Sequence, residues 1–125
     1  MTLLAENDRI CIAQLAKGRD YETLRVSIPA GITLNMGEAV EITTPANGTD
    51  IAVIGELTDV SKAKGIMAGY YDTATEAGTC EGIMIVVAPY GLEKKYIKTP
   101  VGDVKDIVIA NVPFTDTTDV QGELA

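Results

Sequence analysis

The chain has 125 residues, a length that supports one domain with a single core. Hydrophobic residues make up 46% of it and charged residues 22%, which is the composition of a globular protein rather than a disordered one. The formal charge of −8 argues against nucleic-acid binding, because a phosphate backbone needs clustered Lys and Arg. The chain has no long apolar run, so we expect neither a membrane-spanning segment nor a secretory signal.

The residues most often used in catalysis are scarce. The chain has no His, which excludes Ser-His-Asp and Cys-His arrangements. Cys11 and Cys80 are too few to hold zinc without His, and we interpret both as reduced, apolar fillers of strands. A disulfide between them stays open, since spacing alone cannot decide it. We therefore expect no enzymatic activity, no cofactor and no metal ion.

Taken in chain order, the first half of the sequence predicts strands. Residues 1–9 have no clear period and are expected to form an extended arm. Alternating or continuous apolar residues predict strands at 9–15, 21–28, 38–42 and 50–57. The link 43–50 contains the pair Asn47-Gly48, the strongest hairpin signal in the chain. Residues 58–63 fit either a loop or one helical turn.

The stretch 62–91 is expected to organise the rest of the chain, as two buried strands joined by a polar link at 72–79, and residues 83–88 are its most hydrophobic segment. The triplet Gly-Ile-Met occurs at 65–67 and again at 82–84, and each copy opens an apolar strand. The second strand, 83–88, is expected at the centre of the sheet. Met67 and Met84 are interpreted as adaptable core fillers rather than as a contact surface between subunits.

The C-terminal part predicts one more strand, at 104–112, followed by an acidic tail. A strand this apolar near a chain end must pair inside the domain or be covered by another copy. Turn signals recur at short intervals and no segment has a full helical period, which favours a mainly β fold. We expect a single small β-sandwich or β-barrel-like domain with extended termini: arm 1–9, core 10–114 and tail 115–125.

One loop region gathers carboxylates. Asp72, Glu76 and Glu81 could act as an acid and base pair, and with Thr73 they could offer oxygen ligands to Ca²⁺. The calcium loop pattern fails, because its twelfth position falls on Ile83. A solvated acidic turn is the more ordinary interpretation of these residues.

The order of motifs over residues 28–97 resembles that of the small phage head decoration, or cement, proteins. The pattern has a Pro and Gly entry at 28–31, Leu-x-x-Gly-Glu-Ala-Val at 34–40, the Asn-Gly turn, and Ala-x-Gly-Ile-Met at 63–67. The resemblance implies a homotrimer that binds major capsid protein through its N-terminal arm. It also implies a place on the virion surface after assembly in the host cytoplasm.

This resemblance and the apolar character of the two ends suggest which residues make contacts. We expect apolar side chains of the arm and of the C-terminal strand to touch the capsid or a neighbouring subunit: Leu3, Leu4, Ile10, Ile107, Ile109, Val112 and Phe114. Two alternatives stay open. One is another head or tail assembly component, which would form rings. The other is a small-ligand-binding barrel or carboxylate enzyme with a pocket near 72–81.

Overall fold

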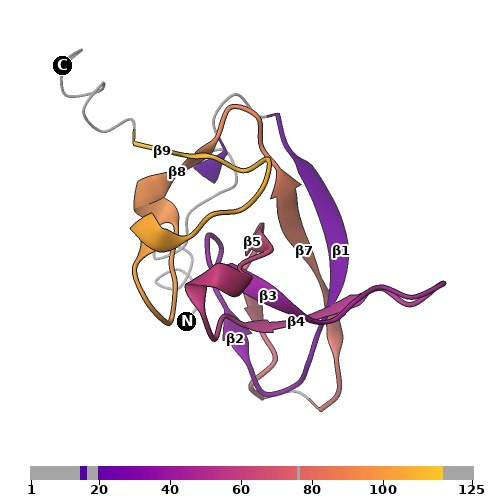
Figure 1. Ribbon diagram of the computed structural model, residues 1–125. Helices are drawn as coiled ribbons and strands as arrows, with labels where there is room; N and C mark the ends of the chain where they lie inside the picture. Colours follow the sequence, from indigo (N-terminus) through magenta and orange to yellow (C-terminus); the bar gives the residue numbers. More distant parts are fainter. Residues whose placement is uncertain (1–14, 17–19, 76, 117–125) are drawn as a thin grey trace, which may run out of the picture.

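The computed structural model describes residues 15–16, 20–75 and 77–116 (Figure 1). Five strands close into a small barrel in the order β1-β4-β3-β5-β7. Neighbouring strands are antiparallel except β1 and β4, which pair in parallel at Val26 with Ala52 and Ser27 with Val53. The barrel strands are β1 (Glu22–Ile28), β3 (Ala39–Thr44), β4 (Ala52–Glu56), β5 (Gly65–Met67) and β7 (Cys80–Val87). The predicted mainly β class is confirmed, in its barrel-like form.

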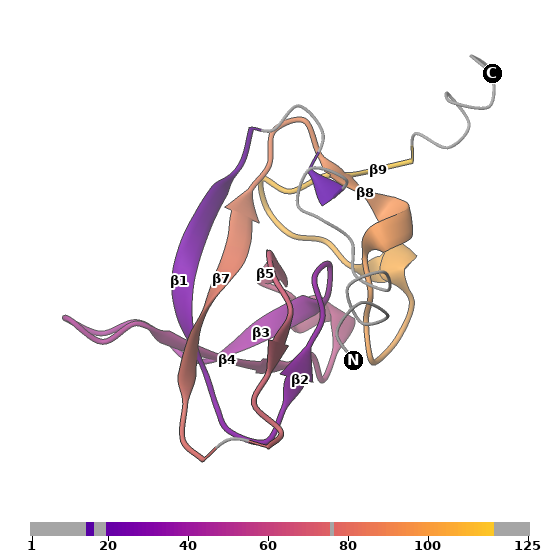
Figure 2. The same cartoon turned by 180° about the vertical axis from the view of Figure 1, so that it is seen from behind.

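Shorter elements extend the barrel. Two of them, β2 (Thr33–Leu34) and β6 (Tyr71–Asp72), pair with each other, and the 3₁₀ turn η2 (Val60–Lys62) follows β4. Residues 88–116, here called the C-terminal lobe, lie against one side of the barrel (Figures 1 and 2). The lobe contains β8 (Leu92–Glu93), η3 (Lys94–Tyr96), η4 (Val104–Asp106) and β9 (Phe114–Thr115).

Two hydrophobic cores lie on opposite faces of β3, β5 and β7. The inner core fills the barrel, and every barrel strand contributes to it: Val26, Ile28, Leu34, Val40, Ile54, Met67 and Met84. The outer core joins the other face of those three strands to the lobe, through residues such as Ala39, Ile66, Ile85, Leu92 and Ile107. Because successive residues of a strand point to opposite faces, strands that are buried on both sides read as continuous apolar runs.

The repeated Gly-Ile-Met triplet has a packing explanation. Met67 and Met84 are cross-strand partners of β5 and β7, and both are fully buried in the inner core, as predicted. A Cβ atom on Gly65 would collide with the side chain of Met84 and lie 2.9 Å from the carbonyl oxygen of Ile85. The first glycine of the repeat therefore makes room for the methionine of the second.

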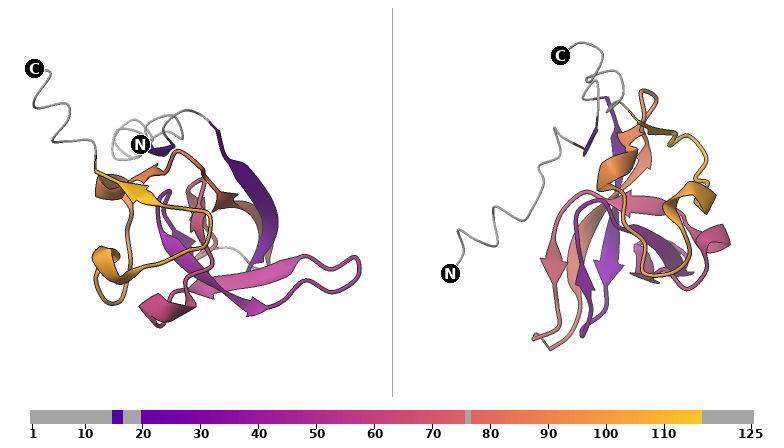
Figure 3. Two further views of the ribbon diagram at one scale, coloured as in Figure 1. Left: turned by 45° about the horizontal axis from the view of Figure 1, so that its top comes forward. Right: turned by 90° about the vertical axis from the view of Figure 1, so that its left-hand side faces the viewer.

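The predicted hairpin is confirmed, with its turn displaced by one residue. The Asn47 N–H donates to the Asp50 carbonyl at 3.0 Å and the Asp50 N–H donates back at 2.9 Å, so Gly48 and Thr49 are the central residues. Only Gly48 of these two has a positive φ, +60°, which fits a turn with glycine at its first central position. Residues 43–50 are all exposed, and they project from the barrel on the side opposite the lobe (Figures 1 and 3).

The predicted strand at 104–112 is wrong. Its first three residues form η4, since the Asp103 carboxylate accepts a hydrogen bond from the Lys105 N–H at 3.1 Å and caps this turn. Asn111, with φ +66°, then reverses the chain between Ile109 and Val112. Ile107, Ile109 and Val112 of this segment pack onto the outer core instead of joining a sheet.

At the N-terminal end, the strand expected at 9–15 lies outside the described residues except for Leu15. That residue has a helical backbone and a buried side chain in the outer core. The loop or helical turn expected at 58–63 is resolved as a loop carrying η2. Cys11 is also outside the described residues, so the interpretation of the two cysteines stays a prediction.

Candidate interaction groove

A groove with a volume of about 310 Å³ crosses the surface of the C-terminal lobe. It lies where η3, η4 and the segment leading into β9 meet. Seven of its nine lining residues are apolar and the other two are lysines: Lys94, Val104, Lys105, Ile107, Val108, Ile109, Val112, Pro113 and Phe114. Apolar side chains and two lysines therefore line the groove together.

Val108 is the residue that most needs explanation. Its side chain is 82% exposed, more than any other large apolar side chain in the described part of the chain. Ile107 and Ile109 on either side of it are buried in the outer core. In an extended stretch, neighbouring side chains point in opposite directions, so burying the two isoleucines turns Val108 outward. Burial of Ile107 and Ile109 thus leaves the Val108 side chain exposed at the surface.

The two lysines oppose the charge of the whole protein. Lys94 belongs to η3 and Lys105 to η4, and within residues 20–75 and 77–116 neither forms an ion pair. The chain as a whole has a formal charge of −8. The lobe, by contrast, has no net charge, because it holds four lysines and four acidic residues: Lys94, Lys95, Lys98, Lys105, Glu93, Asp103, Asp106 and Asp116.

An open strand edge borders the groove. β9 pairs with β8 in parallel, with Leu92 opposite Phe114, and the Leu92 N–H donates to the Pro113 carbonyl at 2.9 Å. In this register the N–H and C=O of Phe114 point away from β8. No strand of the described chain pairs with that side of β9. The Val112 N–H already donates to the Ile109 carbonyl at 3.1 Å, so a further strand could pair only from Phe114 onward.

The predicted contact residues divide into two sets. Ile107, Ile109, Val112 and Phe114 all line the groove, although the first three are mostly buried by the lobe itself. Their role as contacts stays a prediction, and Leu3, Leu4 and Ile10 lie outside the described residues. Sequence reasoning missed Val108 and the two lysines. The alternation of Val108 with two isoleucines was visible, but only the fold shows which of them face inward.

Comparisons with protein-family models, with curated proteins and with solved structures gave no match. The likeness to phage decoration proteins therefore stays with the residue pattern over 28–97. In the structure that pattern covers the centre of the barrel: residues 34–40 run from β2 into β3, and residues 63–67 lead into β5. In the part of the chain described here, no helix is long and apolar enough to cross a membrane.

The acidic loop is not assembled into a site by its described residues. Asp72 is exposed and accepts hydrogen bonds from the Thr33 hydroxyl at 2.9 Å and the Ala74 N–H at 3.1 Å. Thr73 is buried, with its hydroxyl oxygen 2.8 Å from the carbonyl oxygens of Pro29 and Ile32. Residues 20–75 and 77–116 contain no group of three or more acidic, Cys or His side chains suited to a metal ion.

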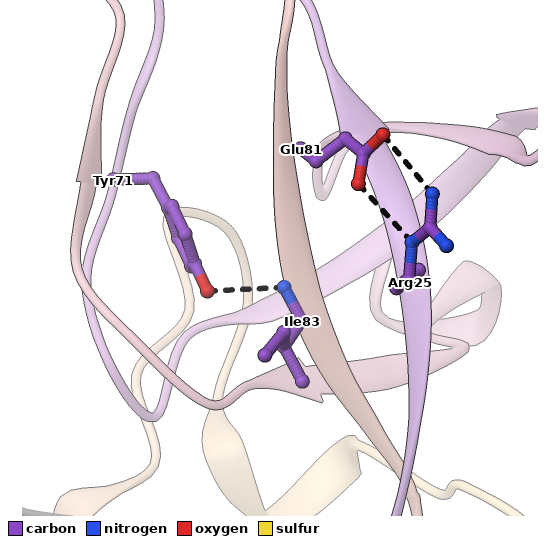
Figure 4. Close-up of polar contacts among 4 residues, drawn as sticks. All are labelled: Arg25, Tyr71, Glu81 and Ile83. Carbon is purple, nitrogen blue, oxygen red and sulfur yellow. Dashed lines mark hydrogen bonds and ion pairs between the residues drawn. The ribbon is translucent and has the colours of Figure 1, made fainter.

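Glu81, the other described carboxylate of this region, faces β1 instead. Its two oxygens each lie 3.1 Å from a nitrogen of Arg25, and both side chains are largely exposed (Figure 4). The nearby Tyr71 hydroxyl accepts a hydrogen bond from the Ile83 N–H at 3.0 Å (Figure 4). Each of these polar groups has a structural partner that ties neighbouring strands together. Glu76 lies outside the described residues.

A second, smaller hollow of about 210 Å³ lies beside β1 and β7. Tyr21, Thr23, Ala68 and Ile83 line it, and none of these carries a charge. The larger groove differs from it in having both an exposed apolar side chain and lysines to orient a bound group. We therefore take the groove of the C-terminal lobe as the candidate site.

Proposed function

We propose that this protein is a structural virion component that binds the outer surface of a phage capsid and stabilises the shell as an oligomer. The observation that carries this proposal is the groove of the C-terminal lobe, where Val108 is 82% exposed beside further apolar side chains and two lysines, since protein interfaces combine apolar side chains with a polar rim. The residue pattern over 28–97 supplies the class of protein. The partner would be the major capsid protein, together with further copies of this chain.

The architecture suits a protein that clamps others together. Burial of β5 and β7 on both faces gives a stiff centre, because close-packed aliphatic cores transmit strain rather than deform. The hairpin 43–50 and the turns η3 and η4, which contribute to the groove, lie on opposite sides of this centre (Figure 2). Two separate contact regions on one rigid body could hold two neighbouring capsid subunits at a set distance.

The alternatives have weaker support. A ligand-binding barrel would need interior space, whereas seven fully buried side chains from the strands fill this one. A carboxylate enzyme would bring acidic side chains together, whereas Asp72 and Glu81 bond to different partners. Another head or tail component would share the groove and the rigid barrel, and only its symmetry would differ.

The test measures oligomeric state and capsid binding together. Light scattering is expected to give three times the mass of the chain. Purified, expanded capsids of the source phage are expected to co-sediment the protein and to melt at a higher temperature with it bound. A ring of another symmetry would favour the other assembly role. A stable monomer that leaves capsids unchanged would refute the proposal.

A further inference from the structure

We infer that the groove of the C-terminal lobe binds an extended, acidic segment of the partner protein, which adds as a strand to the open edge of β9. This inference rests on the proposed function in naming the capsid protein as the source of the segment. Its chemistry is argued from the groove alone. Three properties of the site point to such a segment, namely its charge, its apolar surface and its backbone edge.

The positive charge of the two lysines favours a negatively charged ligand. Among the described residues, Lys94 and Lys105 are the only charged ones that line the groove, in a chain with 18 acidic and 10 basic residues. The Asp103 carboxylate near Lys105 already accepts the hydrogen bond that caps η4. Two lysines without ion pairs in the described structure attract carboxylates and repel a basic segment, and so they give specificity by charge.

The apolar side chains of the groove favour a ligand that has apolar side chains of its own. Val108 and the ring of Phe114 give a bound segment apolar surface to cover, with a lysine available for the polar positions beside it. A segment that carries both apolar and acidic residues matches this lining. Its apolar side chains would cover Val108, while its carboxylates would reach the lysines.

The backbone edge of β9 favours a ligand in an extended conformation. The N–H and C=O of Phe114 point away from β8, toward a side of β9 that no described strand occupies. Strand addition satisfies such groups with main-chain hydrogen bonds, whatever the sequence of the added strand. A helical ligand could not do this, because its own turns use its backbone groups.

A second copy of the chain fits the groove less well than another protein does. A two-fold contact between identical grooves would set the lysines of one copy near those of the other. The groove therefore suits a segment from a different chain.

The experiment uses the full chain and a synthetic probe. The probe is a fluorescein-labelled, end-capped nonapeptide in which Val alternates with Glu, and its control carries Lys in place of every Glu. Fluorescence anisotropy is expected to show binding of the acidic peptide only, weakening as salt rises from about 50 to about 300 mM. On binding, amide exchange at Phe114 is expected to slow at least tenfold, as its edge becomes paired.

Matched variants locate the site. Lys94→Glu combined with Lys105→Glu is expected to weaken peptide binding about tenfold or more, and Val108→Asp is expected to do the same. Lys95→Glu makes half of this charge change outside the groove, where Lys95 lies 5.2 Å from the centre of the Tyr96 ring, and should alter binding less than twofold. Lys94, Lys105 and Val108 are exposed, so these variants should melt as the wild type does.

The outcomes separate this inference from the proposed function. Equal binding of the basic peptide, or an equal loss in Lys95→Glu, would overturn the groove's specificity. If the wild type and the groove variants bind capsids equally well, the inference is refuted and the proposed function stands. Peptide binding without capsid binding would keep the chemistry of the groove and refute the virion role. A fall in oligomer mass in Val108→Asp would make the groove an interface between copies, contrary to the inference.

Discussion

At the scale of single residues, Glu38 is an ionisable group in a place that disfavours its charge. Its side chain is only 6% exposed, next to β3, where residue 38 also bridges Lys98 of the lobe. Burial raises the pKa of Glu38 above 4.5, and the nearby Glu56 adds to the rise, although the Asn35 N–H donates to its carboxylate at 3.2 Å. The folded protein therefore holds this proton more tightly than the unfolded chain does.

Glu38→Gln is expected to raise the free energy of unfolding at pH 7 and to leave it nearly unchanged at pH 4. A raised folded pKa means that the wild type loses stability as the pH rises from about 4.5 through the folded pKa, and glutamine removes that loss. Its amide oxygen can still accept the hydrogen bond from Asn35. Urea unfolding at pH 4 and pH 7 measures the difference, with exposed Glu22→Gln as control. A variant less stable than wild type at pH 7 would contradict the assignment.

At the scale of elements, local signals placed the hairpin but not the conformation of its turn. An Asn-Gly pair is typical of turns with both central residues at positive φ, yet here Asn47 lies at the end of the ladder and Gly48 begins the turn. Register in a hairpin follows from which flanking residues must face the core. Ile42 and Ile54 pair across β3 and β4, but the register then shifts by one residue so that Thr44 pairs with Val53, and this shift places Asn47 opposite Asp50.

Gly48→Ala is expected to weaken the turn and Asn47→Ala to leave it almost intact. A side chain at a φ of +60° costs about 1 kcal/mol, whereas Asn47 has a negative φ that alanine tolerates. Amide exchange at Asn47 and Asp50, the residues of the closing pair, should therefore become about fivefold faster only in the glycine variant. Equal acceleration in both variants would mean that Asn47 and Gly48 are the central pair after all.

At the scale of the whole molecule, the barrel and the C-terminal lobe share three strands. Met84 faces the inner core and its neighbour Ile85 faces the outer one, so β7 belongs to both. The same division separates Val40 from Ala39 on β3. Because neither core can be completed without these strands, we expect one cooperative unit rather than a barrel with an independent lobe.

Met84→Ala and Ile85→Ala are each expected to lower the free energy of unfolding by about 2–5 kcal/mol, as truncations of fully buried side chains do. Both should shift one and the same transition, seen in urea by circular dichroism and by tyrosine fluorescence. Ile83→Ala, on the same strand but 42% exposed, serves as a control with a smaller loss. A separate early transition in Ile85→Ala would show instead that the lobe unfolds alone.

The sequence by itself determined the class of the fold and most of its barrel. Alternation predicted β1, with Leu24, Val26 and Ile28 on one face, of which Val26 and Ile28 are buried and Leu24 is 43% exposed; the apolar run at 83–88 predicted most of β7. It also predicted the burial of Met67 and Met84. These features are readable because side-chain periodicity and turn residues act between near neighbours in the chain.

Only the tertiary structure decided how distant segments meet. Periodicity could not show that β1 closes the barrel by pairing in parallel with β4, because pairing depends on what buries each edge and face. Periodicity also could not show that residues 104–112 form a turn and a loop over the outer core instead of a strand. This arrangement turns Val108 outward. Lys94 and Lys105 meet at one groove for the same reason: their positions depend on long-range packing of the lobe, which a local pattern does not encode.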